Sequence, residues 1–361
     1  MKNNFISLYI SFLLTVCLSS CSQDDILVDN TGVNEKFLLQ ISSHTLKDTS
    51  LKIFNVVDGS LPLIDLNLDC EIDSVRLIKN FRGNYFVFSG HRIIIINNDA
   101  IMSFLDGAIG TISTRIIDFT DIGIVPQSIC FPNATDAYIT FVGSKEIRIL
   151  DLTNFTLPSL LISIGHGSIN SYAGNIAGYG NQVYVLSPGN NLVYIIDTRY
   201  NTVVDSIKIK NTPKFIEFTN NGQYCVIVSD KEPCLSVIEV ATRKIHTERN
   251  ILNNDETNSS ITPTSLSMSN NFVYVSCIKE SNNMGAGCVR ISTSNFRTST
   301  IVSTNSCDFV YYSPKYNSLV IGERNQQQFI NDLIAFKIIN QQSNKLKHSQ
   351  SIPAKITAIS D

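Results

Sequence analysis

The sequence has no tryptophan, few histidines and few charged residues. Charged side chains make up 16% of the 361 residues, the formal net charge is -3, and the sequence pI is near 6.0. Nucleic-acid binding needs clustered lysine and arginine, so this composition predicts no nucleic-acid partner. The absence of tryptophan also argues against a carbohydrate-binding platform, although thirteen tyrosines could take its place.

The motifs of metal binding and of common catalytic sites are missing too. The five histidines show no metal-ligand spacing, and no arrangement of His and Cys resembles a zinc site; they are His44, His91, His166, His246 and His348. There is no G-x-S-x-G elbow or P-loop, and the glycines within 174–180 lack the strand-to-helix context of a dinucleotide fingerprint. The sequence therefore predicts no metal, no cofactor and no catalytic residues.

The sequence has one long apolar run, at the N-terminus. Lys2 supplies a positive charge before it, and the run from residue 5 to residue 18 is too short to span a bilayer stably as a helix. It ends in Leu18-Ser19-Ser20-Cys21, which resembles the lipobox of bacterial lipoproteins, where the cysteine thiol is acylated. We therefore expect a signal peptide over residues 1–20 and a lipid on Cys21. The other interpretation is an ordinary signal peptide in which Cys21 is incidental.

The residues after Cys21 predict a lipidated flexible tether over 21–36. They are polar, show no apolar periodicity and begin with Ser22, Gln23, Asp24 and Asp25. A short acidic tag after the lipidated cysteine resembles the export signal of some Gram-negative lineages that display lipoproteins on the cell surface. We therefore expect a protein that is attached to the outer membrane by lipid alone and faces the outside, with the periplasmic face as the alternative.

A heptamer with proline second and an apolar residue fifth recurs along residues 37–361. The clear copies are VPQSICF at 125–131, TPKFIEF at 212–218, TPTSLSM at 262–268 and IPAKITA at 352–358, and looser copies are EIDSVRL at 71–77, YAGNIAG at 172–178 and SCDFVYY at 306–312. The copies lie 40 to 54 residues apart, which is the length of a four-stranded propeller blade.

Short β-branched and aromatic runs follow most copies, separated by Asn, Asp, Gly and Ser turns, with no convincing helix pattern. The last copy has no room for further strands, while the runs at 37–41, 51–57 and 61–66 have no copy before them. The sequence therefore predicts an all-β, seven-bladed β-propeller in which the C-terminal strand completes the first blade. The alternative is an antiparallel sandwich with a second β domain.

The repeat from Leu192 to Asp230 resembles the YVTN-type β-propeller repeat. Its strand ends in Ile-Asp-Thr, and an Asn-Thr-Val turn, another strand and a Pro-containing inner strand follow in that order. Lipoprotein propellers of this group are similar to surface modules that capture nutrients beside outer-membrane transporters, including cobalamin-capturing propeller lipoproteins. The resemblance implies a ligand, for example a corrinoid, and a transporter partner, and it names no ligand-binding residue.

Seven cysteines follow Cys21, an odd number that cannot pair completely within the chain. Cys277 and Cys288 flank one loop and would lie opposite each other in a hairpin. They form either a disulfide or two small buried apolar side chains. No bond is expected between Cys225 and Cys234, which lie near opposite ends of neighbouring strands.

Propeller geometry predicts where a ligand would bind. The loops that enter the innermost strands, and those that join the second and third strands of each blade, gather on one face. Candidates in these loops are His91, His166, Tyr172, Asp230, Lys231, Glu323 and Arg324, with Asp73, Gln127, Lys214 and Asp308 at the mouth of the channel. For each of them the alternative is a polar loop tip that is simply exposed to water.

Three functions fit these residues. The first is a non-enzymatic binding module that holds a ligand or a transporter by preformed shape. The second is a lactonase-like or lyase-like enzyme that would need a His, a Glu and an Arg to converge in the central funnel. The third is a scaffold that contacts other envelope proteins.

Overall fold

The computed structural model describes residues 35–42, 50–56, 63–73, 75–165, 170–230, 233–252, 261–279, 287–324, 333–340, 346–353 and 355–360. The predicted signal peptide, Cys21 and the tether up to residue 34 lie outside the described residues. Within the described residues, no helix is long and apolar enough to cross a membrane.

The described strands form seven four-stranded antiparallel sheets. The first sheet holds β28 (Lys355–Ser360), β1 (Glu35–Ser42), β2 (Ser50–Val56) and β3 (Leu63–Asp65); the second holds β4 (Val75–Phe81), β5 (Asn84–Ser89), β6 (Arg92–Asn97) and β7 (Thr114–Asp118). The third holds β8 (Pro126–Cys130), β9 (Asp136–Phe141), β10 (Glu146–Asp151) and β11 (Leu161–Ser163); the fourth holds β12 (Ile176–Tyr179), β13 (Gln182–Ser187), β14 (Leu192–Asp197) and β15 (Thr202–Lys208). The fifth holds β16 (Pro213–Phe218), β17 (Tyr224–Ser229), β18 (Cys234–Glu239) and β19 (Lys244–Asn250); the sixth holds β20 (Ile261–Met268), β21 (Phe272–Lys279), β22 (Cys288–Ser292) and β23 (Ser299–Ser303). The seventh holds β24 (Cys307–Ser313), β25 (Ser318–Arg324), β26 (Leu333–Asn340) and β27 (Leu346–Pro353).

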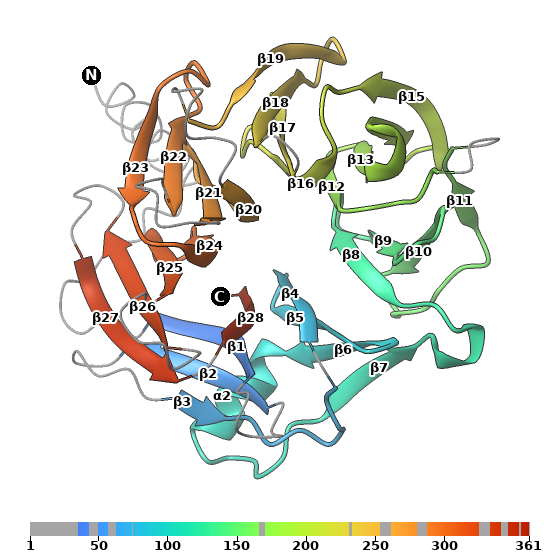
Figure 1. The fold of residues 1–361 in the computed structure, drawn as a ribbon. Helices are drawn as coiled ribbons and strands as arrows, with labels where there is room; N and C mark the ends of the chain where they lie inside the picture. The colour runs from blue at the N-terminus through green and yellow to red at the C-terminus, as the bar shows by residue number, and fades with distance from the viewer. Residues whose placement is uncertain are drawn as a thin grey trace, which may run out of the picture. The chain divides into compact units, whose positions relative to one another are not determined.

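One strand of each sheet contacts its counterparts in two neighbouring sheets. These inner strands are β28, β4, β8, β12, β16, β20 and β24, and their contacts run in that order and return from β24 to β28 (Figure 1). Strand β28 is also hydrogen-bonded to β1, with Leu38 opposite Ser360, so strands from the two ends of the chain share one sheet. The predicted all-β propeller fold is confirmed.

The recurring heptamers mark the inner strands, with one error of register. In β8, Pro126 pairs with β9 immediately before a bulge and Ile129 follows three residues later; in β4, Val75 and Ile78 occupy the same two places. The predicted copy at 71–77 is therefore three residues too early. The reason is that Val75 and Ile78 are both apolar and no proline marks the start of β4, so the pattern fits in either register.

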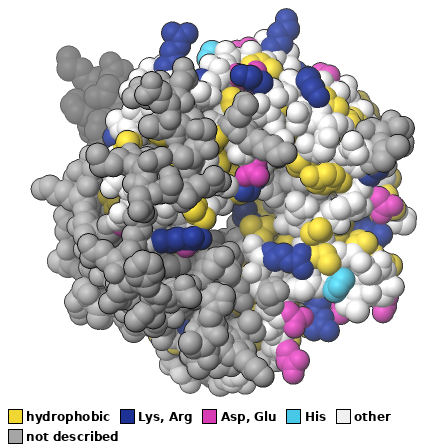
Figure 2. All heavy atoms as spheres, viewed as in Figure 1, with side chains coloured by type: hydrophobic (Ala, Val, Ile, Leu, Met, Phe, Trp, Pro, Cys, Tyr) yellow, Lys and Arg dark blue, Asp and Glu magenta, His cyan; other side chains and the backbone are white. Residues whose placement is uncertain are grey.

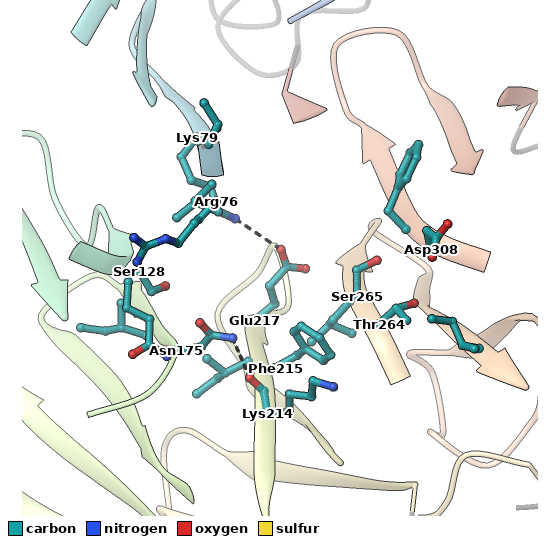
Figure 3. Close-up of a pocket in the computed structure, with 18 of the residues that line it drawn as sticks. Arg76, Lys79, Ser128, Asn175, Lys214, Phe215, Glu217, Thr264, Ser265 and Asp308 are labelled. Atoms are coloured by element: carbon teal, nitrogen blue, oxygen red, sulfur yellow. Dashed lines mark hydrogen bonds and ion pairs between the residues drawn. The ribbon is translucent and has the colours of Figure 1, made fainter. Parts of the chain in front are cut away.

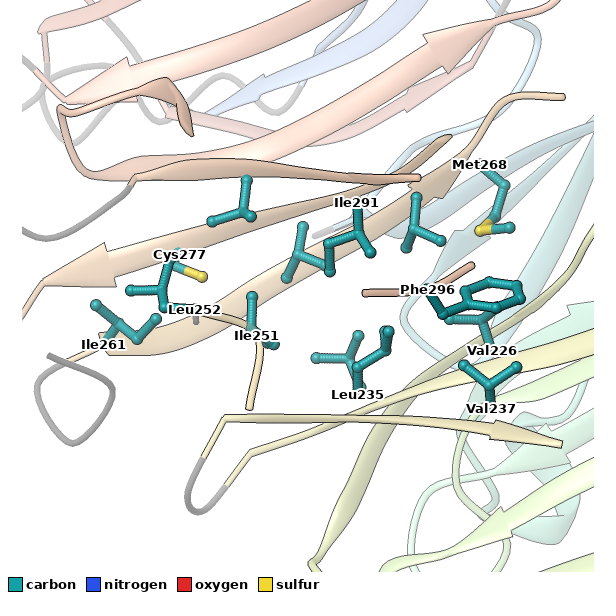
Figure 4. Packing of buried hydrophobic residues seen from close by; sticks show 14 residues of the cluster. Val226, Leu235, Val237, Ile251, Leu252, Ile261, Met268, Cys277, Ile291 and Phe296 are labelled. Atoms are coloured by element: carbon teal, nitrogen blue, oxygen red, sulfur yellow. The ribbon is translucent and has the colours of Figure 1, made fainter. Parts of the chain in front are cut away.

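The middle strands are buried on both sides, which explains their continuous apolar runs. In β13, every residue after Gln182 is buried, whereas six of the seven residues of β15 are exposed. Successive sheets pack against each other through these strands: Val226 and Val237 of the fifth sheet lie in one cluster with Val275 and Ile291 of the sixth (Figure 4). The apolar side chains that join neighbouring sheets thus form the core, and the outermost strands remain in water.

Helix α2 (Asn98–Leu105) corrects the expectation of no helix. Asn97 precedes it as N-cap, and its side chain accepts a hydrogen bond of 2.8 Å from the Asp99 backbone N–H. Ile101 is buried in the cluster that joins the first two sheets, and Phe104 packs against the same cluster. The helix follows β6 directly and is only eight residues long, which is why its apolar spacing is inconspicuous in the sequence. Two 3-10 turns, η1 (Thr120–Ile122) and η2 (Pro188–Asn190), complete the described elements.

Cys277 and Cys288 do not form the disulfide that the sequence left open, and the alternative of two buried thiols is observed. Both are free thiols, and the residue opposite Cys288 in the sheet is Ser276. Because side chains alternate between the faces of a strand, the two sulfurs point to opposite faces. Burial raises the pKa of Cys277 to about 12, so this thiol stays protonated and unreactive at neutral pH. Cys225 and Cys234, for which no bond was expected, are also free.

Candidate binding site

Five inner strands carry a β-bulge at the third position of the heptamer, counted in the corrected register for β4. The register of the ladder shifts by one between Val75 and Leu77, and likewise near the start of β8, β16, β20 and β24. The residues at these shifts are Arg76, Gln127, Lys214, Thr264 and Asp308. A bulged residue is left out of the ladder and its side chain can be aimed away from the sheet. All five of these side chains are polar, and all five line one cavity.

This cavity lies between the inner strands and has a volume of about 640 Å³ (Figure 3). Its lining comprises Val75, Arg76, Leu77, Lys79, Gln127, Ser128, Asn175, Ile176, Lys214, Phe215, Ile216, Glu217, Thr264, Ser265, Leu266, Ile278, Asp308, Phe309 and Arg324. Small-molecule sites are commonly about 300 to 1,000 Å³ with a few placed polar groups among apolar ones. The cavity is therefore large enough for a small ligand.

Two of the four basic side chains of the cavity are held by nearby carboxylates. Arg324 lies 2.8 Å (Nε) and 2.6 Å (Nη2) from Asp308 Oδ1. Lys214 Nζ donates to Asp230 Oδ1 at 2.7 Å and to the Pro263 carbonyl at 3.0 Å. These contacts fix both cations against the wall before any ligand arrives.

Lys79 and Glu217 face each other from strands that are not neighbours. Lys79 is on β4 and Glu217 on β16, with β8 and β12 between them in the ring, and Lys79 Nζ lies 4.0 Å from Glu217 Oε1 (Figure 3). This distance is too long for a hydrogen bond. Glu217 Oε2 is buried and has no hydrogen-bond partner among the described residues. Burial raises the pKa of Glu217, and Lys79 lowers it by a smaller amount.

Arg76 differs from the other three cations of the cavity in its contacts with carboxylates. Its Nη2 makes one long hydrogen bond of 3.4 Å to the Gly90 carbonyl. Among the described residues, no carboxylate lies within ion-pair distance of it. On the face shown in Figure 2, Lys and Arg side chains of the described residues are dispersed among acidic and uncharged ones. Arg76 is therefore distinguished by its place in the cavity rather than by a basic surface around it.

The two hydroxyl groups that β20 contributes to the cavity are hydrogen-bonded to the protein. Thr264 Oγ1 donates to the Cys307 carbonyl at 2.8 Å, and Ser265 Oγ accepts from the Val310 N–H at 2.8 Å. Both hydroxyls also lie within 2.8 Å of Ser276 Oγ. The bonds to Cys307 and Val310 tie β20 to β24. The described residues contain no group of three or more potential metal ligands.

Four of the predicted ligand residues line the cavity, and a fifth forms an ion pair with one of them. Gln127, Lys214, Asp308 and Arg324 belong to the lining, and Asp230 holds Lys214. The first three were expected at the channel mouth because they lie where the chain enters an innermost strand, and each is the third residue of its heptamer. In the structure the bulge falls at this position of the heptamer in all three strands.

The remaining described candidates lie outside the cavity lining. The Asp73 N–H donates to Ser89 Oγ at 2.8 Å, and His91 Nδ1 lies 2.9 Å from the Ile124 carbonyl. Glu323 is 4% exposed and accepts from Ser303 Oγ at 2.7 Å and from an Asn305 side-chain N–H, so it stabilises the loop before β24. Tyr172 is half-buried. His166 and Lys231 lie outside the described residues.

Sequence reasoning missed the charged residues on β4 and at the sixth heptamer position. Arg76 was missed because of the register error, which put Asp73 in its place. Lys79 and Glu217 occupy equivalent positions on β4 and β16, three residues after the bulge. The sequence does contain a signal for this pair: one inner strand carries a basic residue at the position where another carries an acidic one. Ser128 and Asn175 were missed because nothing in their local sequence distinguishes them from turn residues.

Comparison with known proteins supports the fold only. No protein-family model matches the chain, and a search of curated proteins finds no relative. A solved structure from Lactobacillus plantarum superposes with a TM-score of 0.65 at 12% identity, covering 91% of this chain and 99% of that one. A protein from Bacteroides fragilis, named as a candidate 6-phosphogluconolactonase, gives 0.64 at 11% identity, covering 90% and 97%. One of the same name from Bacteroides uniformis gives 0.64 at 10% identity, covering 90% and 99%. At these identities the similarity defines the class of the fold, a β-propeller with lactonase-type neighbours.

Proposed function

We propose that this protein is a non-enzymatic binding propeller that takes a small polar ligand into its central cavity. In this proposal the seven sheets are the blades, the C-terminal strand closes the ring, and lipid on Cys21 holds the domain at the outer surface of the outer membrane. The ligand would then pass to a neighbouring transporter. The observation that carries the proposal is the bulge: five inner strands each present one polar side chain to the same cavity.

The bulges make the cavity a preorganised site. Its polar side chains come from rigid strands, and Lys214 and Arg324 are already held by Asp230 and Asp308. Less conformational freedom is lost on binding when side chains are ordered beforehand. A scaffold that met its partners only through outer loops would not need polar groups at this position. We therefore favour ligand capture over the scaffold.

Blocking the cavity should abolish binding. Gln127→Trp places a large side chain among the lining residues, and Lys244→Trp on exposed β19 is the matched control. Binding of cyanocobalamin, glucose, glucose 6-phosphate and glucosamine 6-phosphate is measured by titration calorimetry. We expect at least one of them to bind the wild type, with affinity lowered tenfold or more in Gln127→Trp and unchanged in Lys244→Trp. If none of the four binds the wild type with a Kd below about 1 mM, or if binding survives Gln127→Trp, the proposal is wrong.

A second candidate function is lactone hydrolysis. It is favoured by the environment of Glu217 and by the names of two of the similar solved structures. A carboxylate with a raised pKa beside a cation can act as general base. Glu217 would take a proton from water, and the water oxygen would bond to the lactone carbonyl carbon. The ring C–O bond would then break, and the ring oxygen would receive the proton back from Glu217 to give a hydroxy acid. Lys79 could stabilise the oxyanion that forms on the way.

Turnover distinguishes this enzyme from a binding module. If the protein is a lactonase, 6-phosphogluconolactone should be hydrolysed faster than in buffer alone, and Glu217→Gln should lower kcat by roughly 100-fold or more, as expected for loss of a general base. Lys244→Gln, on the exposed outer strand, should leave the rate unchanged. A wild-type rate equal to that of buffer would rule out this candidate and leave the binding module.

A further inference from the structure

We infer that the ligand of the central cavity carries an anionic group at one end, bound by Arg76, and an N–H or O–H donor at the other, bound by Glu217. The inference rests on the proposed binding function and names the chemical class of its ligand: a small, elongated anion that also carries hydroxyl or ammonium donors. It depends on which charged side chains of the cavity already have partners and which do not.

Arg76, the positive pole of the cavity, is the cation that has no carboxylate partner among the described residues, while Lys79 lies beside Glu217. Lys214 and Arg324 are neutralised by Asp230 and Asp308 at 2.7 and 2.6 Å, while Arg76 has only the 3.4 Å contact with the Gly90 carbonyl. A guanidinium presents a planar fork of donors that suits a carboxylate or a phosphate. Because Arg76 is a bulged residue, binding an anion there requires no break in the hydrogen bonds of β4.

Glu217 is the unsatisfied acceptor of the cavity. Its side chain is 29% exposed, yet Oε2 is buried without a hydrogen-bond partner and Oε1 has only Lys79 at 4.0 Å. A carboxylate removed from water without hydrogen bonds is costly. A ligand donor that reached this carboxylate would supply the missing hydrogen bond and would also compensate for the loose contact with Lys79.

The two poles lie at different depths. Arg76 precedes Lys79 by three residues on β4, which is roughly 10 Å of strand, and Lys79 marks the level of Glu217. Uncharged groups, among them Gln127, Ser128 and Asn175, line the cavity with them. An elongated ligand with its charge at one end fits this distribution. Inorganic phosphate would engage only the first pole, and a neutral sugar only the second.

Three probes and two variants test the inference. Glucosamine 6-phosphate and glucose 6-phosphate both carry a phosphate and differ in an ammonium and a hydroxyl, and inorganic phosphate has the anion alone. We expect Arg76→Gln to weaken the Kd of both sugar phosphates by tenfold or more. Glu217→Gln should raise the Kd for glucosamine 6-phosphate by tenfold or more and the Kd for inorganic phosphate by less than twofold. If Glu217→Gln also weakens the binding of glucose 6-phosphate, a hydroxyl group is a sufficient donor to Glu217.

The controls separate failure of this inference from failure of the proposed function. Arg297→Gln and Lys244→Gln remove exposed cations and should leave every Kd unchanged. If Gln127→Trp abolishes sugar phosphate binding while Arg76→Gln or Glu217→Gln does not weaken it, the two-pole assignment is overturned and ligand capture in the cavity stands. If binding survives Gln127→Trp, the ligand lies elsewhere and the proposed function fails. Circular dichroism of each variant confirms that it is folded.

Discussion

Deleting residues 355–361 should lower the midpoint of thermal unfolding by about 10 °C or more, the shift expected from loss of several kcal/mol. The deletion removes β28, which pairs with β1 from Leu38 to Ser42 and contacts both β4 and β24. Without it, β1 has an unpaired edge and the ring of inner strands is interrupted between β24 and β4. Differential scanning calorimetry of the truncated and complete chains measures the effect.

A peptide and a shorter truncation control this experiment. Removing Asp361 alone leaves every residue of β28 in place and should not change the midpoint. A synthetic peptide of residues 352–361, added to the truncated protein, should restore part of the lost stability because it can pair with β1. A truncated protein that unfolds at the same temperature as the complete chain would show that β28 contributes nothing to closure.

Phe296→Ala should destabilise the protein by about 3–5 kcal/mol, the range for removing a buried aromatic side chain. Phe296 is 1% exposed and packs in the cluster that joins the fifth and sixth sheets (Figure 4). Its ring makes an edge contact with Tyr224, the two centroids being 5.1 Å apart. Alanine at this position would leave a cavity between two sheets and keep the positive φ of 52°. Urea denaturation followed by circular dichroism measures the loss.

Tyr200→Ala is the matched aromatic control. Tyr200 is 71% exposed in the turn between β14 and β15, where its ring lies near the Arg199 guanidinium. We expect a change within about 1 kcal/mol, as for most exposed substitutions. If Phe296→Ala costs no more than Tyr200→Ala, the packing between these two sheets is not what stabilises them.

Most of the fold could be predicted from the sequence because its signals are local. Buried middle strands give unbroken β-branched runs, and the heptamer with an apolar fifth residue identifies the inner strand of each sheet. The errors arose where that local signal was ambiguous. In β4 two apolar residues, Val75 and Ile78, fit the same pattern, and in α2 the helical period extends over only eight residues.

Less of the candidate site could be predicted because its contacts are long-range. Gln127, Lys214 and Asp308 were accessible to sequence reasoning because they lie where the chain enters an innermost strand, although the bulge at each of them was not predicted. The contact between Lys79 and Glu217 could not be predicted, because it depends on how two non-neighbouring strands face each other in the folded protein. The hydrogen bonds that remove Glu323 from the cavity depend likewise on the path of the loop before β24.

The repeated bulge also separates stability from recognition. Arg76, Gln127, Lys214, Thr264 and Asp308 stand where the ladder skips a residue. Exchanging their side chains therefore leaves the backbone pairing of each sheet intact. A combinatorial library at these positions, without Thr264 because its hydroxyl ties β20 to β24, would sample new selectivities on the same backbone framework. The same freedom would let descendants of one gene diverge in the ligands they bind.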